Sequence, residues 1–358
     1  MASIWHFFFP NQSLYAEHIV DYVLTVLQFA IIPNVFFNLL MAMILLSVAQ
    51  MKRISWVFLK TILLLWATVS VILFGIWWFM LDSSLVLLNV PVFSYENMGL
   101  SFALPLVICV SIILGVGVVS LPSLHFLKPY IEFCQEKVAM LFEGVFVLLP
   151  VLVFFVVVNF LSNVGDSHIH WIFNYMGLSI TFVSIFLLGV LPFLYWSLLS
   201  VSVKEYCQLV MPVVIMTILA GDSIAAIPLI SRATDTFGAK RDPKISQVLT
   251  LVVICFPWLG ELANLIFPMF SAAAEGVSAL GVIKMLSVGP FFMFTDPLIS
   301  VPALLKSFGF PSFYRDAYLA LAQLTDHMFE ACEALAVLLV CARLKSTLYP
   351  HDSDVPTD

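Results

Sequence analysis

Three carboxylates, Asp326, Glu330 and Glu333, lie within a run of otherwise apolar residues from Tyr318 to Leu344. Residues four and seven apart in an α-helix point in nearly the same direction, so all three share one stripe. A charged acid at the centre of a membrane helix costs about 2.5 to 3.5 kcal/mol on insertion scales. The stripe must therefore face a water-filled cavity, bound cations, protons or a partner segment. The alternative is that one or more of these acids lies near the membrane surface.

A second polar group lies in the apolar segment from Ser246 to Ala274. Glu261 and Asn264 are three residues apart, so they share one helix face and can meet the acidic stripe. Pro257 and Pro268 flank them and are expected to break the helix, which exposes backbone carbonyls as cation ligands. The alternative is that Asn264 merely bonds a neighbouring backbone carbonyl.

The composition determines the class of protein. With 62% hydrophobic and 10% charged residues and several apolar runs longer than about 20 residues, the sequence predicts a polytopic α-helical membrane protein. The net charge of -7 and the lack of a basic cluster argue against nucleic acid as a partner. Small solutes, ions, membrane lipids and other copies of the chain remain. The six cysteines have irregular spacing that suits neither zinc nor a disulfide framework. No nucleophile with a base partner is recognisable, so we expect no enzyme.

The distribution of basic residues predicts the topology, because cytoplasmic loops are enriched in Lys and Arg. If Lys52 and Arg53 are cytoplasmic, 12 of the 15 basic residues fall on that side. This requires segments 206–236 and 286–312 each to enter and leave on the same side, as re-entrant hairpins. The cytoplasmic set is Lys52, Arg53, Lys60, Lys128, Lys137, Lys204, Arg232, Lys240, Arg241, Lys244, Arg343 and Lys345, and the external set is Lys284, Lys306 and Arg315.

The two expected hairpins share a pattern in which an acid stands six residues before a proline. The residues are Asp222, Ser223 and Pro228 in the first segment and Asp296, Ser300 and Pro302 in the second. Such a repeat is expected of an inverted-topology transporter, where two broken hairpins meet near the midplane and bind solute and ions. The alternative is two unrelated loops that both contain proline.

Several stretches along the chain resemble one known family. They are LQFAIIPNVFFNLLMAMIL at Leu27–Leu45, LPLVICVSIILGVGV at Leu104–Val118, GDSIAAIPLISRATDTFG at Gly221–Gly238 and LTDHMFEACEALAVLLVCARL at Leu324–Leu344. Together they resemble the dicarboxylate and amino acid:cation symporters, which include the glutamate transporters. The resemblance aligns Ser223 with a serine of the first hairpin tip, and Asp326 and Glu330 with two acids of the last span. It implies a glutamate transporter-like fold that lacks the first span and assembles as a homotrimer.

The sequence also departs from this family. Residues Gly260–Pro268, GELANLIFP, replace the family's motif in its seventh span, and Thr295–Ala303, TDPLISVPA, replace the glycine-rich tip of the second hairpin. Glu333 stands where the family has an arginine, and Val337 and Cys341 occupy two of its sodium-binding positions. An acid in place of the arginine reverses the charge offered to a solute, so a cationic or zwitterionic molecule is favoured over a dianion.

We therefore expect a symporter that moves a small organic solute, amino acid-like or dicarboxylate-like, across the inner membrane. Coupling is to protons or sodium, with no other cofactor, and crowded carboxylates favour protons. The predicted cation ligands are Asp326, Glu330, Glu261 and Asn264, and the predicted solute contacts are Asp222, Ser223, Thr295, Asp296, Glu330 and Glu333. The competing hypothesis is a degenerate relative that serves as a membrane sensor or scaffold.

The expected hairpins and the family resemblance together predict three regions. Residues 1–205 form the scaffold and early spans with the trimer contacts. Residues 206–345 form the transport core, which contains both hairpins, the broken span and the last span. Residues 346–358 form a cytoplasmic tail.

Overall fold

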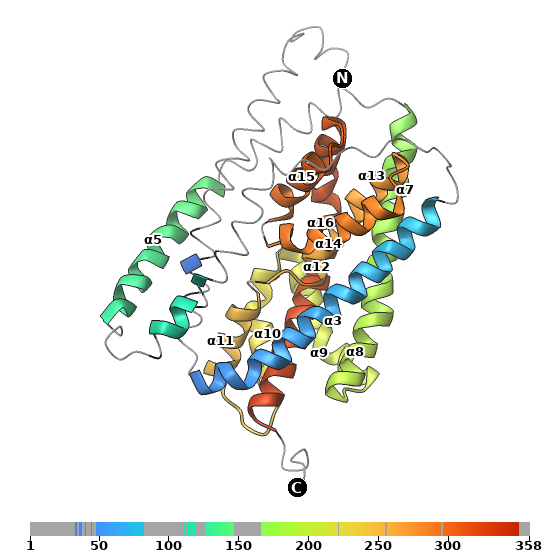
Figure 1. Cartoon of the computed structure of the whole chain (residues 1–358). Coiled ribbons are helices and arrows are strands. Elements are labelled where there is room, and N and C mark those ends of the chain that lie inside the picture. The colour runs from blue at the N-terminus through green and yellow to red at the C-terminus, as the bar shows by residue number, and fades with distance from the viewer. Residues whose placement is uncertain are drawn as a thin grey trace.

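The computed structural model describes residues 48–81, 126–146 and 166–350 without 221, 255 and 295, together with scattered positions in 33–44 and 107–120. Within these residues all regular structure is helical (Figure 1). Three helical segments, Lys52–Met80, Ile172–Leu199 and Val203–Ala220, are long and apolar enough to cross a membrane. The expected all-α membrane protein is therefore confirmed at this level. The stretch from Leu27 to Leu45 that supports the family resemblance lies largely outside the described residues.

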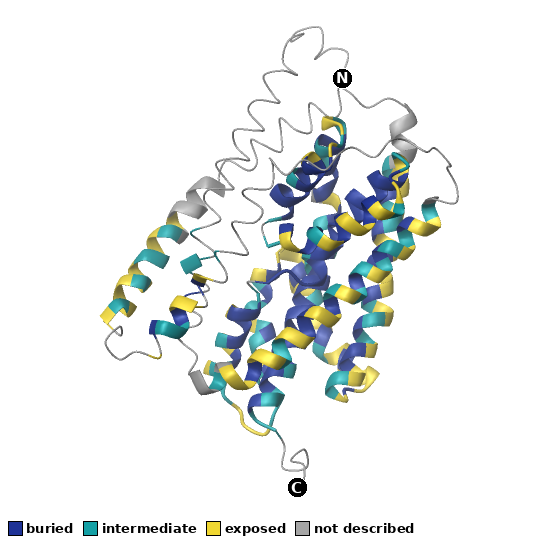
Figure 2. Ribbon diagram, in the orientation of Figure 1, coloured by how far each residue is buried: buried dark blue, intermediate teal, exposed yellow. Residues whose placement is uncertain are grey.

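The last helix, α16 (Ser312–Leu348), is the centre of the described bundle. Every residue from Ala331 to Ala342 is at most 3% exposed, and Figure 2 shows the helix enclosed by its neighbours. A helix that is apolar around its whole circumference must be covered on all sides, and the run of Ala, Leu, Val and Cys here meets that condition. The helix continues to Leu348, so the tail begins later than the expected residue 346.

Two long helical segments pack against α16 and expose apolar side chains outward. Helix α3 (Val48–Leu81) buries Leu65, Leu73 and Trp77, whereas its Trp78 and Phe79 are exposed, as expected of a lipid-facing surface. The second segment consists of α7 (Asp166–Ile185), a π-helical turn (Phe186–Val190) and α8 (Leu191–Leu199).

The π-helical turn has a local cause. Pro192 lacks an N–H for the carbonyl of Leu188, so the regular α-helical hydrogen bond is missing at this turn.

Helix α5 (Lys128–Phe146) lies to one side of the main bundle in Figure 1.

The first predicted hairpin turns back on itself. Helix α9 (Val203–Ala220) starts near the end of α16, and α10 (Ile227–Thr234) returns to it after a short 3-10 turn at Ser223–Ala226. At the outer end, Arg343 donates to the carbonyl of Leu198 and Lys345 pairs with Asp235. At the tip, Ser223 contacts Glu330, which lies 15 residues, or about 22 Å of helix, from Lys345.

The second predicted hairpin approaches from the opposite end. Helix α14 (Ala279–Phe292) leads to a turn at Asp296, and α15 (Pro297–Ser307) returns toward the start of α16. Near the outer end, the Tyr314 hydroxyl donates to Glu275 at 2.5 Å. The pair begins at residue 279 rather than at the expected 286. Both segments fold back as the basic residues predict, and their re-entry into a membrane stays a prediction.

The segment between the two pairs is broken twice. It consists of α11 (Pro243–Val253), α12 (Leu259–Ala263) and α13 (Ile266–Ala274). The first break falls at Pro257 as expected. The second falls at Asn264–Leu265 and not at Pro268, which is the third residue of α13. A proline is tolerated in the first turn of a helix because its missing N–H has no intrahelical partner there, so the break precedes it.

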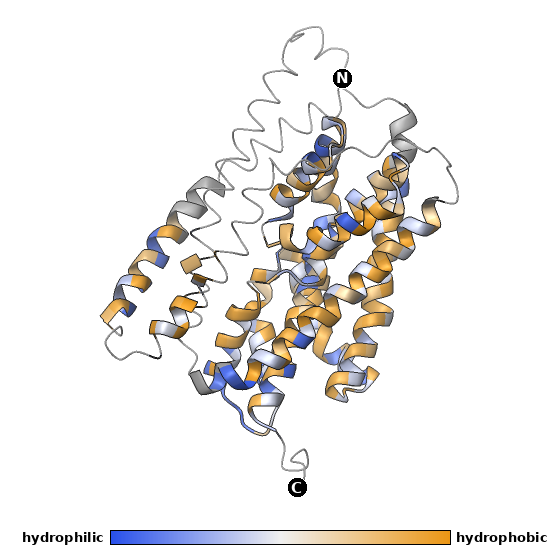
Figure 3. Cartoon of the chain, viewed as in Figure 1, coloured by the Kyte–Doolittle hydropathy of each residue, from blue (hydrophilic) through white to orange (hydrophobic). Residues whose placement is uncertain are grey.

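Several polar and basic residues lie at the end of the bundle where α3 begins and α16 ends. The residues Gln50, Arg53, Leu348 and Tyr349 line one cavity, and the backbone N–H of Ala239 donates to Tyr349 O at 2.8 Å. Figure 3 shows hydrophilic residues at this end of the bundle. Arg53, Lys240 and Lys345 thus lie near one another at this end, and the orientation of the chain in a membrane stays a prediction.

Candidate functional site at the hairpin tips

The tip of the first hairpin is bound to the acidic stripe of α16. The backbone N–H of Ser223 donates to Glu330 Oε2 at 2.8 Å. This contact joins residues 107 positions apart in the chain, and it brings two predicted solute contacts together. A carboxylate that accepts from a backbone N–H forms one of the stronger hydrogen bonds in proteins.

The acids of the internal repeat have the same local role. Asp222 accepts from the N–H of Ile224 and Asp296 accepts from the N–H of Leu298, both at 2.8 Å. Asp222 thus caps the 3-10 turn at Ser223–Ala226, which precedes the returning helix α10, and Asp296 caps the returning helix α15 directly. The prolines differ in position, because Pro228 is the second residue of α10 and Pro302 is the sixth of α15. The two aspartates of the repeat therefore make the same local contact, whereas the two prolines occupy different positions in their helices.

Carboxylates from both hairpins converge on α16. Glu330, Asp296 and Asp222 all lie close enough to Asp326 for Coulombic repulsion, and the same two hairpin aspartates act on Glu330. Like charges in a site of low dielectric repel strongly unless a proton or a cation neutralises them. The structure thus brings together four of the predicted site residues that belong to three separate elements.

Glu333 has a different environment from Glu330. It is 3% exposed, and its carboxylate accepts from the N–H groups of Trp258 at 3.3 Å, Gly260 at 2.9 Å and Glu261 at 3.2 Å. These are the first N–H groups of α12, which have no partner within that helix. The geometry therefore favours a role for Glu333 in positioning α12 over direct selection of a charged solute, which stays a prediction.

Gly260 allows α12 to approach α16 this closely. A Cβ at this position would lie 2.2 Å from the carbonyl oxygen of Phe329 and 2.5 Å from the Cβ of Glu333. Neither distance is possible without moving a backbone, so only glycine fits. This requirement was not recognised from the sequence, because nothing in a run such as GELAN indicates which residue meets a distant helix.

The polar groups around the two breaks are mostly satisfied. Asn264 donates to the carbonyl of Gly260 at 3.2 Å and accepts from the Tyr318 hydroxyl at 2.8 Å. Asn264 therefore bonds a neighbouring carbonyl, as the simpler of the two readings expects. Tyr318 was missed in the sequence, although a tyrosine in an apolar run usually needs a partner for its hydroxyl.

Carbonyls at the first break are also occupied, contrary to the expectation that they are exposed as cation ligands. The indole N–H of Trp66 donates to Pro257 O at 3.0 Å, and that of Trp258 donates to Val253 O at 2.7 Å. Glu261 differs, because its Oε2 atom is buried and has no hydrogen-bond partner within the part of the chain that the structure describes. A buried acid without a partner is a candidate for a proton or a cation.

The neighbour of Asp326 contacts the first hairpin. The Nδ1 atom of His327 lies 3.0 Å from the carbonyl oxygen of Ile218, near the end of α9. The residue is exposed, and its position next to Asp326 on the helix directs it about 100° away from that residue. Thr295, the remaining predicted solute contact, lies outside the described residues.

No metal centre is visible in the described segments, where no three His, Cys, Asp or Glu side chains are arranged to hold an ion. Comparison with known proteins adds no assignment, since neither a family model nor a curated protein matches the chain.

Proposed function

We propose that the chain is a secondary active transporter, a symporter that moves a small organic solute, amino acid-like or dicarboxylate-like, together with protons or sodium. The contact between Ser223 N and Glu330 Oε2 carries the proposal, because it ties a helix-turn-helix tip to the acidic stripe. Discontinuous helices and hairpin tips that meet at ionisable residues are a recurrent arrangement in secondary transporters. The family resemblance adds a glutamate transporter-like fold, a homotrimer and the inner membrane to this proposal.

In this mechanism Glu330 is both an ion-binding group and a latch. As a carboxylate it accepts from Ser223 N and holds the first hairpin tip against α16. A proton or sodium ion on Glu330 competes for the same oxygen and weakens the latch. Asp326 belongs to the same charged group through its repulsion by Glu330, Asp296 and Asp222, so one bound cation relieves several repulsions at once.

The test is the change of Glu330 to Gln in protein reconstituted into liposomes. A first screen by thermal shift with amino acids, amines and dicarboxylates, at two pH values and with or without sodium, supplies the solute. The variant is expected to exchange solute across the membrane but not to accumulate it under a pH gradient, because an amide cannot release a proton. Glu132→Gln, an exposed carboxylate on α5, is the matched control and should accumulate solute as the parent does.

Two results would contradict the assignment of Glu330 as the group that couples transport to protons. Accumulation by Glu330→Gln equal to that of the parent would remove Glu330 from the coupling mechanism. Parental uptake that followed sodium and ignored pH would exclude coupling to protons.

A second candidate function is a membrane sensor or scaffold that no longer transports. One observation favours it, namely that Asp222, Asp296 and Glu333 all accept from backbone N–H groups and so contribute to the fold itself. A scaffold would bind none of the screened solutes at either pH. Its Glu330→Gln variant would differ from the parent in stability alone.

A further inference from the structure

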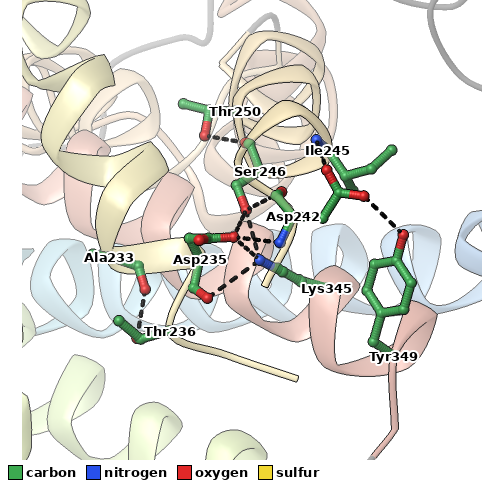
Figure 4. Close-up of polar contacts among 9 residues, drawn as sticks. All are labelled: Ala233, Asp235, Thr236, Asp242, Ile245, Ser246, Thr250, Lys345 and Tyr349. Carbon is green, nitrogen blue, oxygen red and sulfur yellow. Dashed lines mark hydrogen bonds and ion pairs between the residues drawn. The ribbon is translucent and has the colours of Figure 1, made fainter. Parts of the chain in front are cut away.

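The loop between α10 and α11 is fixed against the end of α16. Gly238 has a φ of +80°, and a Cβ there would lie 3.0 Å from Tyr349 O, so both its conformation and its contact require glycine. The next residue, Ala239, donates its N–H to the same carbonyl at 2.8 Å. A few residues earlier, Asp235 pairs with Lys345 (Figure 4). The position of the loop relative to α16 is therefore defined by several independent contacts.

A cavity of about 230 Å³ lies beside this loop, between the start of α3 and the end of α16. Its lining is mixed in character and consists of Gln50, Arg53, Leu348 and Tyr349. The Nζ of Lys240 lies over the ring of Tyr349, 5.7 Å from the ring centroid. A guanidinium and an amide group thus line one small space, and an ammonium group lies at the ring of a third lining residue, Tyr349.

The two acids near this place, Asp235 and Asp242, both have other partners. Asp242 accepts from Ile245 N at 3.3 Å as the cap of α11 and lies 3.5 Å from the Tyr349 hydroxyl. Asp235 is bound by Lys345. The remaining basic residues of these segments are exposed, and they are Lys52, Arg53, Lys240, Arg241 and Lys244.

We infer that this cavity binds the phosphate group of an anionic phospholipid. Arginine is suited to phosphate because its planar N–H groups form paired hydrogen bonds with two oxygens. Basic pockets between helices at the cytoplasmic surface are the places where anionic headgroups bind membrane proteins. The cavity lies at the first turns of α3, a helix long enough to cross the membrane, so the headgroup level is the expected depth. Leu348 supplies an apolar wall for the glycerol part of the lipid.

Lipid binding at this cavity does not depend on the proposed transport activity. Native mass spectrometry of the full chain in a neutral detergent tests it. The probes are phosphatidylglycerol, phosphatidylcholine and inorganic phosphate. The parent is expected to retain phosphatidylglycerol in preference to phosphatidylcholine. Arg53→Gln and Lys240→Gln should each weaken its retention about fivefold, and the double variant about 25-fold, if the two charges act additively. Lys306→Gln removes an exposed charge at the opposite end and should bind as the parent does.

Three outcomes would overturn the inference. The first is unchanged retention of phosphatidylglycerol in the double variant with a parental circular dichroism spectrum. The second is an equal loss in Lys306→Gln, which would indicate a general effect of charge. The third is displacement of the lipid by inorganic phosphate at equal concentration, which would make the cavity a site for free phosphate.

Discussion

Replacing Lys345 by Met tests the polar cluster at the end of α16. Lys345 is fully buried, and its ammonium group donates to the Asp235 carboxylate, to Ser246 Oγ at 2.8 Å and to the carbonyl of Asp235 at 3.3 Å (Figure 4). These contacts connect α16 to both α10 and α11. Methionine has a similar length and fills the same space without the charge, so the substitution removes the electrostatic contacts and preserves most of the packing.

The expected loss of stability follows from the burial of the two partners. Removing one member of a buried ion pair costs about 3 to 5 kcal/mol, because the other charge is left without compensation. The Asp235 side chain is 17% exposed and keeps its bonds from Asp242 N at 2.9 Å and from Ser246 Oγ at 3.1 Å. Water and these donors compensate part of the loss, so the cost should lie near the lower limit, at about 3 kcal/mol.

The same cluster predicts a dependence on pH. Burial raises the pKa of Asp235. Hydrogen bonds from Lys345, Asp242 N and Ser246 together lower it by more, so the pKa lies below its ordinary value. A carboxyl group with a lowered pKa contributes stability that is complete above its unfolded pKa and is lost as the pH falls through its folded pKa. Without Lys345 the pKa moves back toward the ordinary value. The variant should therefore lose less stability than the parent on acidification.

Thermal unfolding in a neutral detergent measures both effects. A loss of about 3 kcal/mol should lower the midpoint by roughly 4 °C for a chain of 358 residues. Lys306→Met removes an exposed lysine from the end of α15 and should change the midpoint little. The double variant Asp235→Asn with Lys345→Met should be more stable than Lys345→Met alone, because no unpaired charge remains. A Lys345→Met midpoint within about 1 °C of the parent, or an equal loss in Lys306→Met, would refute the reasoning.

Two further predictions concern the broken span. Gly260→Ala should lower the thermal midpoint strongly, since an added methyl group overlaps the carbonyl oxygen of Phe329, and overpacking costs typically about 1 to 3 kcal/mol or more; a midpoint equal to that of the parent would show that α12 and α16 can separate freely. Trp66→Phe should cost about 0.5 to 1.5 kcal/mol, because it removes the N–H bonded to Pro257 O and keeps an aromatic ring in place; a neutral result in the same assay would show that water replaces the indole.

Local features of the sequence predicted much of the architecture. The apolar composition indicates a membrane protein, and the spacing of Asp326 and Glu330 places them on one helix face. Pro257 marks a break because a proline lacks an N–H, and the charge distribution together with the acid-to-proline spacing marks the two segments that fold back. Each of these inferences needs only the residue types and their order along the chain.

Contacts between distant residues were not predictable in the same way. The pattern places Glu333 on the acidic stripe, but it contains no information that the first N–H groups of α12 lie opposite, 72 to 75 residues away in the chain. For the same reason the need for glycine at position 260 was missed. The burial of Lys345 was also missed, because a lysine near a helix end is usually solvated.

The unequal attachment of Glu330 and Glu333 indicates which parts of the site can separate. A hydrogen bond to a charged group contributes about 1.5 to 3 kcal/mol. One backbone N–H at the hairpin tip donates to Glu330, whereas three backbone N–H groups donate to Glu333 at the start of α12, which also packs on α16 through Gly260. Releasing the hairpin tip from Glu330 therefore breaks fewer backbone hydrogen bonds than releasing α12 from Glu333. In the proposed mechanism we therefore expect α12 and α16 to move as one unit, and a cation that competes for Glu330 to release the tip without disturbing the broken span.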